Sequence, residues 1–122
     1  MKQQAATVLI ISPSPIVRQG LTTILQDCED MRAVVGSGGG TEALALCRQH
    51  RPHVCILDSE FLDASSVDYL AAIHQEVPQS RIFVLTVTER DTRFARAREA
   101  GACACLPKGI SGRELINRIR AG

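Results

Sequence analysis

The sequence predicts one doubly wound α/β domain, in which five helices cover both faces of a five-stranded parallel sheet. Short apolar runs rich in β-branched residues alternate with segments of helical periodicity along the 122 residues. The runs are apolar throughout, as in "TVLII" at 7–11, which is typical of strands buried on both faces. The length suits a single domain, and 45% hydrophobic residues supply enough apolar surface for one core.

Start and stop signals justify each element in turn. Ser14 and Pro15 predict an N-cap followed by a first helical residue, Thr41 and Ser111 predict further N-caps, and Gly101 predicts a helix end. We expect strands at 7–11, 31–36, 53–58, 81–87 and 102–106. We expect helices at 15–27, 41–50, 65–76, 91–100 and 112–121.

Composition and charge exclude several classes of function. One Tyr, three Phe and no Trp leave little for stacking on bases, and a net charge of +1 is too small for a nucleic-acid-binding domain. No run approaches the about 18 apolar residues of a membrane span, so we expect a cytoplasmic chain without membrane contact. Residues 1–89 hold six Lys/Arg against ten Asp/Glu, whereas residues 90–122 hold eight against three. This uneven charge predicts that one side of the domain faces a different partner from the other side.

Five cysteines lie within apolar segments and predict buried thiols in a reducing compartment: Cys28, Cys47, Cys55, Cys103 and Cys105. Cys103 and Cys105 would share one face of a strand, but a reactive thiol needs exposure and a lowered pKa. We expect burial in a central strand to prevent this. His50 and His53 flank a turn without further ligands nearby, which favours loop residues over a metal site.

Three polar side chains lie at the carboxyl ends of the predicted strands, where open parallel sheets hold their chemistry. Asp58 ends the third strand, Thr86 ends the fourth and Lys108 follows the fifth. Such a carboxylate could attack a phosphoryl group while the ammonium neutralises phosphate charge and the hydroxyl donates to a phosphate oxygen. A structural Asp–Lys ion pair beside an ordinary strand threonine explains the same residue types equally well.

Taken in order, the motifs resemble the receiver domain of two-component response regulators. The similar segments span nearly the whole chain: "SPIVRQGLTTIL", "VVGSGGGTEALAL", "RPHVCILD", "FVLTV" and "EAGACACLPKGISGRELINRI". They are most similar to the LuxR/NarL subclass, in which the receiver precedes a helix-turn-helix domain. The resemblance implies a flavodoxin-like sheet of order 2-1-3-4-5, a receiver domain over 1–122 and a DNA-binding helix-turn-helix domain outside this chain.

The resemblance also implies roles for residues and partners. Asp58 would be the phosphoacceptor, Thr86 the switch hydroxyl and Lys108 the phosphate-binding cation, with a histidine kinase as the partner. The domain would be a signalling module rather than an enzyme. A homodimer or an effector domain would contact the fourth helix, fifth strand and fifth helix. Seven arginines lie in this region: Arg90, Arg93, Arg96, Arg98, Arg113, Arg118 and Arg120.

One departure from the family concerns the metal. The family ends its first strand with two acidic residues that hold Mg²⁺ together with the phosphoacceptor, whereas this chain has Ser12 and Pro13. Asp58, a carbonyl near Glu60 and the Ser12 hydroxyl remain as ligands, with Glu60 or Asp63 as doubtful substitutes for the missing acids. We therefore expect no Mg²⁺ cofactor and slow phosphorylation, because phosphoryl transfer depends on the metal to neutralise charge.

A second departure concerns the switch. Cys105 stands where the family commonly has a Tyr or Phe ring that changes rotamer together with Thr86, and cysteine is too small for that movement. Without the metal, Lys108 becomes the counter-ion of Asp58. We expect a direct salt bridge between them that holds the pocket in one arrangement.

Three functional hypotheses follow. The first is an atypical receiver that relays a signal by protein contact, with impaired or absent Mg²⁺-dependent phosphorylation. The alternative is a functional phosphoacceptor that a histidine kinase phosphorylates on Asp58. The third is a redox or small-molecule sensor. A nucleotide-binding domain is disfavoured, because "GSGGG" lacks the glycine spacing of a dinucleotide fingerprint and follows the second strand.

Overall fold

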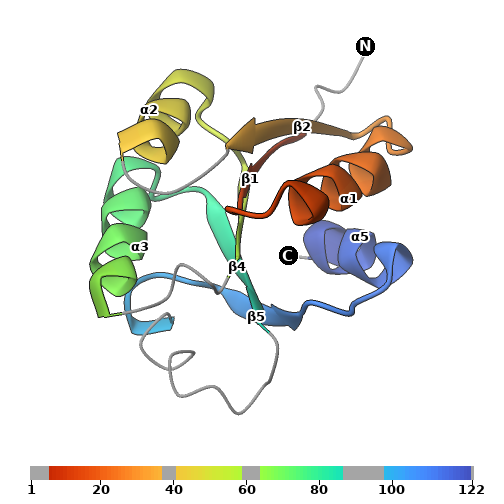
Figure 1. Ribbon diagram of the computed structural model, residues 1–122. Helices are drawn as coiled ribbons and strands as arrows, with labels where there is room; N and C mark the ends of the chain where they lie inside the picture. Colours follow the sequence, from red (N-terminus) through yellow and green to blue (C-terminus); the bar gives the residue numbers. More distant parts are fainter. Residues whose placement is uncertain (1–5, 37–40, 59–63, 87–97, 122) are drawn as a thin grey trace.

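A computed structural model of the chain describes residues 6–36, 41–58, 64–86 and 98–121. Its centre is a five-stranded sheet of order β2-β1-β3-β4-β5, in which all neighbouring strands run parallel (Figure 1). This confirms the predicted fold class and strand order. β1 and β3 are neighbours although they are not consecutive in the chain, because β2 pairs with the other side of β1.

The element bounds agree with the predicted ones within two residues. The strands are β1 (Ala6–Ile11), β2 (Met31–Gly36), β3 (Val54–Asp58), β4 (Arg81–Thr86) and β5 (Ala104–Pro107). The helices are α1 (Pro15–Gln26), α2 (Thr41–His50), α3 (Ala64–Glu76) and α5 (Gly112–Ala121). Four helices are thus described where five were predicted. The helix predicted over 91–100 lies almost entirely outside the described residues.

The sheet lies between two layers of helices, with α2 and α3 on one side and α1 and α5 on the other (Figure 1). One face of the strands packs with α2 and α3 through a cluster that includes Leu9, Leu57 and Leu70. The other face packs with α1 and α5 through a cluster that includes Ile10, Leu25 and Leu115. Successive strand residues alternate between the two clusters, so the continuous apolar runs fill both layers, as the sequence predicts.

Capping side chains fix the ends of α1 and α5. The Ser14 hydroxyl accepts a hydrogen bond from the Val17 backbone N–H at 3.4 Å, with Pro15 at the first helical position. The Ser111 hydroxyl accepts from the Glu114 N–H at 3.1 Å. Thr41, the third predicted N-cap, is instead the first residue of α2. Ser14 and Ser111 are confirmed as N-caps. They matter for the site, because these helices begin next to the carboxyl ends of the strands.

The C-terminal end of α5 is tied to the sheet. Arg120 donates two hydrogen bonds to the carboxylate of Asp30, at 2.9 and 3.0 Å, and holds the pKa of that carboxyl below its ordinary value. The Arg81 guanidinium donates to the backbone carbonyl of Ile119. One of the arginines predicted to form an external docking surface therefore makes an intramolecular contact.

The cysteines are less uniformly buried than expected. Cys47 and Cys55 are buried, Cys28 and Cys105 are half-buried, and Cys103 is exposed. The expectation that a central strand buries Cys103 is wrong, because β5 is the edge strand and Cys103 precedes it. Partial desolvation nevertheless raises the pKa of the Cys103 thiol, which disfavours the thiolate that reacts.

Gly101 occupies a backbone conformation that favours glycine, with φ of +124°. A Cβ atom at this position would lie 2.5 Å from Cγ of His74 on α3. We therefore expect Gly101→Ala to lower the free energy of unfolding by about 2 kcal/mol or more, because backbone strain and a steric clash add. Urea unfolding followed by circular dichroism measures this.

Gly20 provides the matched control. It lies in the middle of α1, is exposed, and has no heavy atom within 4 Å of an added Cβ. Gly20→Ala should stabilise the domain by about 0.5–1 kcal/mol, because alanine loses less backbone entropy in a helix. Equal effects of the two substitutions would contradict this assignment of strain to position 101.

Candidate functional site

The carboxyl ends of β1, β3, β4 and β5 gather the predicted site residues at one edge of the sheet. Ser12 follows β1, Asp58 ends β3 and Thr86 ends β4, and each is at most 2% exposed. Lys108 follows β5, and its backbone N–H donates to the Thr86 carbonyl at 2.9 Å. The order of the strands thus brings together residues that lie up to 96 positions apart, from 12 to 108.

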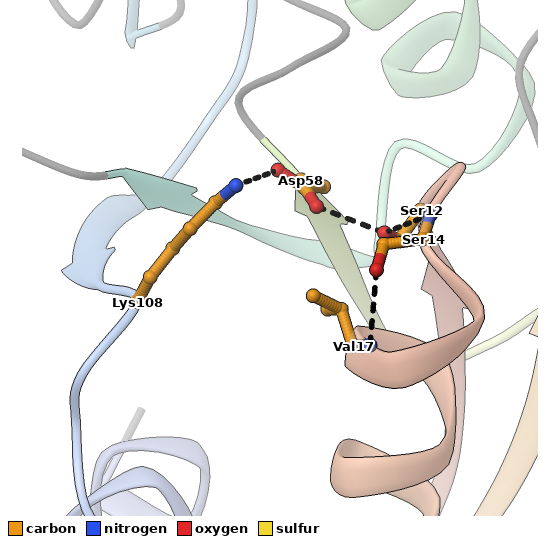
Figure 2. A network of polar contacts seen from close by, with 5 residues as sticks. All are labelled: Ser12, Ser14, Val17, Asp58 and Lys108. Atoms are coloured by element: carbon orange, nitrogen blue, oxygen red, sulfur yellow. Dashed lines mark hydrogen bonds and ion pairs between the residues drawn. The ribbon is translucent and has the colours of Figure 1, made fainter.

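Asp58 uses both carboxylate oxygens within the chain (Figure 2). Its Oδ1 lies 2.8 Å from Nζ of Lys108, and its Oδ2 accepts a hydrogen bond from the Ser12 hydroxyl at 2.8 Å. The Asp58 side chain is fully buried, whereas that of Lys108 is 24% exposed. A buried carboxylate needs such partners to compensate its lost hydration. The predicted Asp58–Lys108 salt bridge is confirmed.

The Ser12 hydroxyl connects this carboxylate to the start of α1 (Figure 2). While donating to Asp58, it accepts from the Ser14 backbone N–H at 3.1 Å, and Ser14 in turn caps α1 at Val17. The Arg18 guanidinium donates to the Ser12 carbonyl at 2.7 Å. One chain of hydrogen bonds therefore links the buried aspartate to the turn between β1 and α1.

The stem of Lys108 packs below the ion pair. It lines a cavity of about 170 Å³ between α1 and α5, together with apolar side chains that include Val17, Leu85 and Leu115. These apolar side chains suit contact with the methylene groups of the lysine. The ammonium group at the end of the side chain contacts Asp58.

The described residues do not fit a magnesium ion. The part of the chain that the structure describes holds no group of three His, Cys, Asp or Glu side chains placed to bind a metal. Pro13 is exposed and has no side-chain oxygen, so the second acidic position supplies no ligand. Asp58 supplies a single carboxylate that already contacts an ammonium group. Glu60 and Asp63, the doubtful substitute ligands, lie outside the described residues.

The switch position lies on the edge strand. Cys105 is half-buried, pairs in register with Val84 of β4, and packs against the α2–α3 side of the core. Thr86 is two residues beyond Val84, so strand alternation places its side chain on the same side of the sheet. Cys105 and Thr86 therefore lie on the same side of the sheet, with a small thiol where the family commonly has a ring. The loss of the coupled movement stays a prediction.

His50 and His53 lie on either side of the turn between α2 and β3. His53 is exposed, and its Nδ1 accepts a hydrogen bond from the Thr7 backbone N–H at 3.0 Å. The His53 backbone N–H donates to the Thr7 carbonyl at 2.9 Å, which completes a two-point contact between β1 and the start of β3. His50 is the last residue of α2. His53 therefore lies in the turn before β3, as expected, whereas His50 ends α2 and is not a loop residue.

The predicted arginine-rich surface is described only in part. Arg118 pairs with Glu114 one turn away on α5 at 3.1 Å, and Arg113 is exposed on the same helix. Arg90, Arg93 and Arg96 lie outside the described residues. The docking function of this surface stays a prediction.

Comparison with known families decides the identity of the domain. The family model for the response regulator receiver domain matches residues 8–120. The chain belongs to this family. The receiver domain is 28% identical over 113 residues to the response regulator GacA of Pseudomonas aeruginosa, covering 93% of this chain and 53% of that protein. It is 28% identical over 118 residues to the nitrate/nitrite response regulator protein homolog of Haemophilus influenzae, covering 97% and 57%.

The chain thus spans about half the length of these curated relatives. Solved receiver structures share the fold. The signal receiver domain of NarL from Mycobacterium tuberculosis superposes with a TM-score of 0.83 at 21% identity, covering 98% of this chain and 96% of that one. The chemotaxis protein CheY4 of Vibrio cholerae gives 0.84 at 23% identity, covering 96% and 98%. None of the helices within the described ranges is long and apolar enough to cross a membrane.

Removing the lysine tests the salt bridge. Lys108→Ala leaves the buried Asp58 carboxylate without its counter-ion, so the free energy of unfolding should fall. We expect a loss of about 2 kcal/mol, below the range for fully buried pairs, because the ammonium group is partly solvated. Urea unfolding at neutral pH measures it.

Arg118→Ala is the matched control, because it removes a cation from an exposed pair on α5. That change should leave the unfolding free energy nearly unaltered. If Lys108→Ala were as neutral as Arg118→Ala, the salt bridge would not compensate the burial of Asp58.

Proposed function

We propose that this domain is an atypical receiver that relays a signal by protein contact, with Mg²⁺-dependent phosphorylation impaired or absent. One observation carries the proposal: both oxygens of the Asp58 carboxylate are bonded within the chain, to Lys108 and to Ser12. In phosphoryl transfer to a receiver, that carboxylate is the nucleophile, and a metal ion neutralises charge on the moving group.

The electrostatic argument starts from the missing acids. Three carboxylates would give this pocket an excess of negative charge that attracts a divalent cation. Here Ser12 and Pro13 are neutral, and the charge of Asp58 is balanced by Lys108. Because these groups together carry no net charge, the pocket would not compensate a hard cation for the loss of its hydration water. Each Asp58 oxygen also contacts a positively charged or hydrogen-bonding partner, which would lower its reactivity as a nucleophile.

The mechanical argument concerns switching. A switch needs two arrangements of similar free energy. The Asp58 carboxylate holds the turn before α1 through Ser12 and the turn before α5 through Lys108. We propose that this double contact fixes both turns in one arrangement. The faces of α1 and α5 would then be presented constantly, and regulation would come from the partner.

The output would be transcriptional. The relatives include the transcriptional regulatory protein YxjL of Bacillus subtilis, of which this chain covers 56%. We propose that a C-terminal helix-turn-helix domain binds DNA and lies outside residues 1–122. The domain would act in the cytoplasm and contact the effector domain or a second copy through β5, α5 and the predicted helix over 91–100.

A second candidate function rests on the residues that are retained. Asp58, Thr86 and Lys108 lie together at the carboxyl ends of their strands. This placement favours a receiver that a histidine kinase still phosphorylates on Asp58, with weakened dependence on metal. The two candidates differ in whether phosphate becomes attached to Asp58.

Phosphorylation by a small donor separates the two candidates. After incubation with acetyl phosphate and millimolar Mg²⁺, we expect no protein with the added mass of a phosphoryl group, because the carboxylate stays bonded to Lys108 and no metal is held. Mass spectrometry of the intact chain measures this, with a receiver that has both acidic residues as the positive control. Labelling that Asp58→Asn abolishes would favour the second candidate.

Restoring acidic residues at positions 12 and 13 tests whether their absence impairs phosphorylation. In Ser12→Asp/Pro13→Asp, two carboxylates should again compete with Lys108 and hold Mg²⁺ beside Asp58. We expect the rate of labelling by acetyl phosphate to rise at least about tenfold and to depend on Mg²⁺. Ser12→Asn/Pro13→Asn has nearly the same shape without the charge and should stay unlabelled. Equal rates in the two variants would contradict the argument from charge.

A further inference from the structure

The cavity between α1 and α5 has apolar walls and one charged side chain. Its volume is about 170 Å³, and the buried side chains of Leu21, Leu85 and Leu115 form its inner wall. Val17 and Ile24, which are half-buried, line it nearer to the solvent. An apolar cavity of about 150 Å³ is large enough to hold a benzene molecule. This cavity therefore has room for the apolar body of a small ligand.

A ligand can enter this cavity from the solvent. Gly20 lines the cavity on α1 and is exposed. It lies between the half-buried Val17 and Ile24 on the same helix face, because residues three and four positions apart are neighbours on a helix surface. These three residues form the mouth of the cavity. Entry through the mouth requires no part of the described fold to open.

The structure gives Gly20 no packing reason to be glycine. It lies in the interior of α1, where glycine stabilises a helix less than alanine does. Its φ does not lie in the left-handed region, and no heavy atom lies within 4 Å of a Cβ built at this position. A larger side chain here would narrow the mouth. Gly20 thus leaves open a path that most other residues would restrict.

Lys108 gives this apolar cavity a positive charge. It lines the cavity, and its Nζ lies 2.8 Å from Oδ1 of Asp58. In Figure 2, the side chains of Val17 and Lys108 lie on either side of the space below Asp58. The Lys108 side chain is 24% exposed, so solutes can approach it. An ammonium group has three N–H donors, which a second carboxylate can share with Asp58.

We propose that this cavity binds a small carboxylic acid with a compact apolar body, of the size of benzoate. The apolar body would leave water for the walls formed by α1, β4 and α5. The carboxylate would accept a charge-assisted hydrogen bond from Lys108. Binding requires neither phosphorylation nor a metal, so the site itself is independent of the proposed function.

A bound carboxylate would act on the contact that organises the candidate site. It would share the Lys108 ammonium group with Asp58 and so weaken the contact between Asp58 and the turn before α5. An acid of this class would then be an input for a receiver that phosphate does not switch. This role as an input, unlike the binding itself, rests on the proposed function.

An NMR titration with benzoate tests the proposal. In the ¹⁵N-labelled domain at neutral pH, we expect millimolar benzoate to cause saturable shifts of the backbone amides of Val17, Gly20 and Ile110, which line the cavity. Benzyl alcohol has nearly the same size without the charge and should bind at least about tenfold more weakly. Acetate has the charge without the apolar body and should cause no saturable shift.

Two outcomes of this titration overturn the proposal: no saturable shift with benzoate, or equal affinities for benzoate and benzyl alcohol. Neither outcome affects the proposed function, which labelling by acetyl phosphate tests separately.

Closing the mouth locates the site. Gly20→Leu should fold at least as stably as the unmodified domain, because leucine favours a helix more than glycine does. We expect its affinity for benzoate to fall at least about tenfold, because the new side chain obstructs the mouth. Gln19→Leu adds the same side chain at an exposed position of α1 outside the cavity lining and should bind as before. Equal affinities of the two variants would place the site elsewhere and overturn the proposal.

Removing the charge identifies the group that binds the carboxylate. Lys108→Met keeps most of the apolar stem and removes the ammonium group. Its affinity for benzoate should fall to that for benzyl alcohol. A folded Lys108→Met domain that still prefers benzoate would overturn the assignment of the carboxylate to Lys108. Should this variant fail to fold, the comparison of Gly20→Leu with Gln19→Leu decides alone.

Discussion

The buried carboxylate of Asp58 is the constraint on which the candidate site depends. A negative charge without water contact must be compensated, and here Lys108 and Ser12 do so from two different turns. In a receiver with a full acidic pocket, a metal ion would share this compensation. In this chain the compensation comes from its own side chains. Under the proposed function, the same contacts that stabilise Asp58 would oppose its use as a nucleophile.

The fold explains why one carboxylate can reach two turns. In the order β2-β1-β3-β4-β5, β3 is central, with β1 on one side and β4 and then β5 on the other. Ser12 leaves β1 and Lys108 leaves β5, so Asp58 at the end of β3 lies between them. Asp58 thus contacts residues in the turns that precede both α1 and α5. A change in the partners of Asp58 would reach both helices on the same face.

Much of this arrangement could be predicted from the sequence, for identifiable physical reasons. Apolar runs and capping residues such as Ser14 and Ser111 predict the elements, and the resemblance supplies the strand order. The missing acids at 12 and 13 predict the salt bridge between Asp58 and Lys108, which the structure contains. The contacts of Arg18 and Arg120 could not be predicted, because long side chains reach partners that only the tertiary fold brings near. Cys103 is exposed because it precedes β5, which is an edge strand in the order that the resemblance implies, so the expectation of a central strand conflicted with that order.

The most direct test of the central claim is whether a divalent cation binds beside Asp58. Mn²⁺ has the ligand preference of Mg²⁺ and broadens the NMR signals of nearby backbone amides. In a titration of the ¹⁵N-labelled domain, the account predicts no selective, saturable broadening at Asp58 and Lys108 up to millimolar Mn²⁺. Broadening that centres on Asp58, saturates at one ion per chain and is displaced by Mg²⁺ would contradict it.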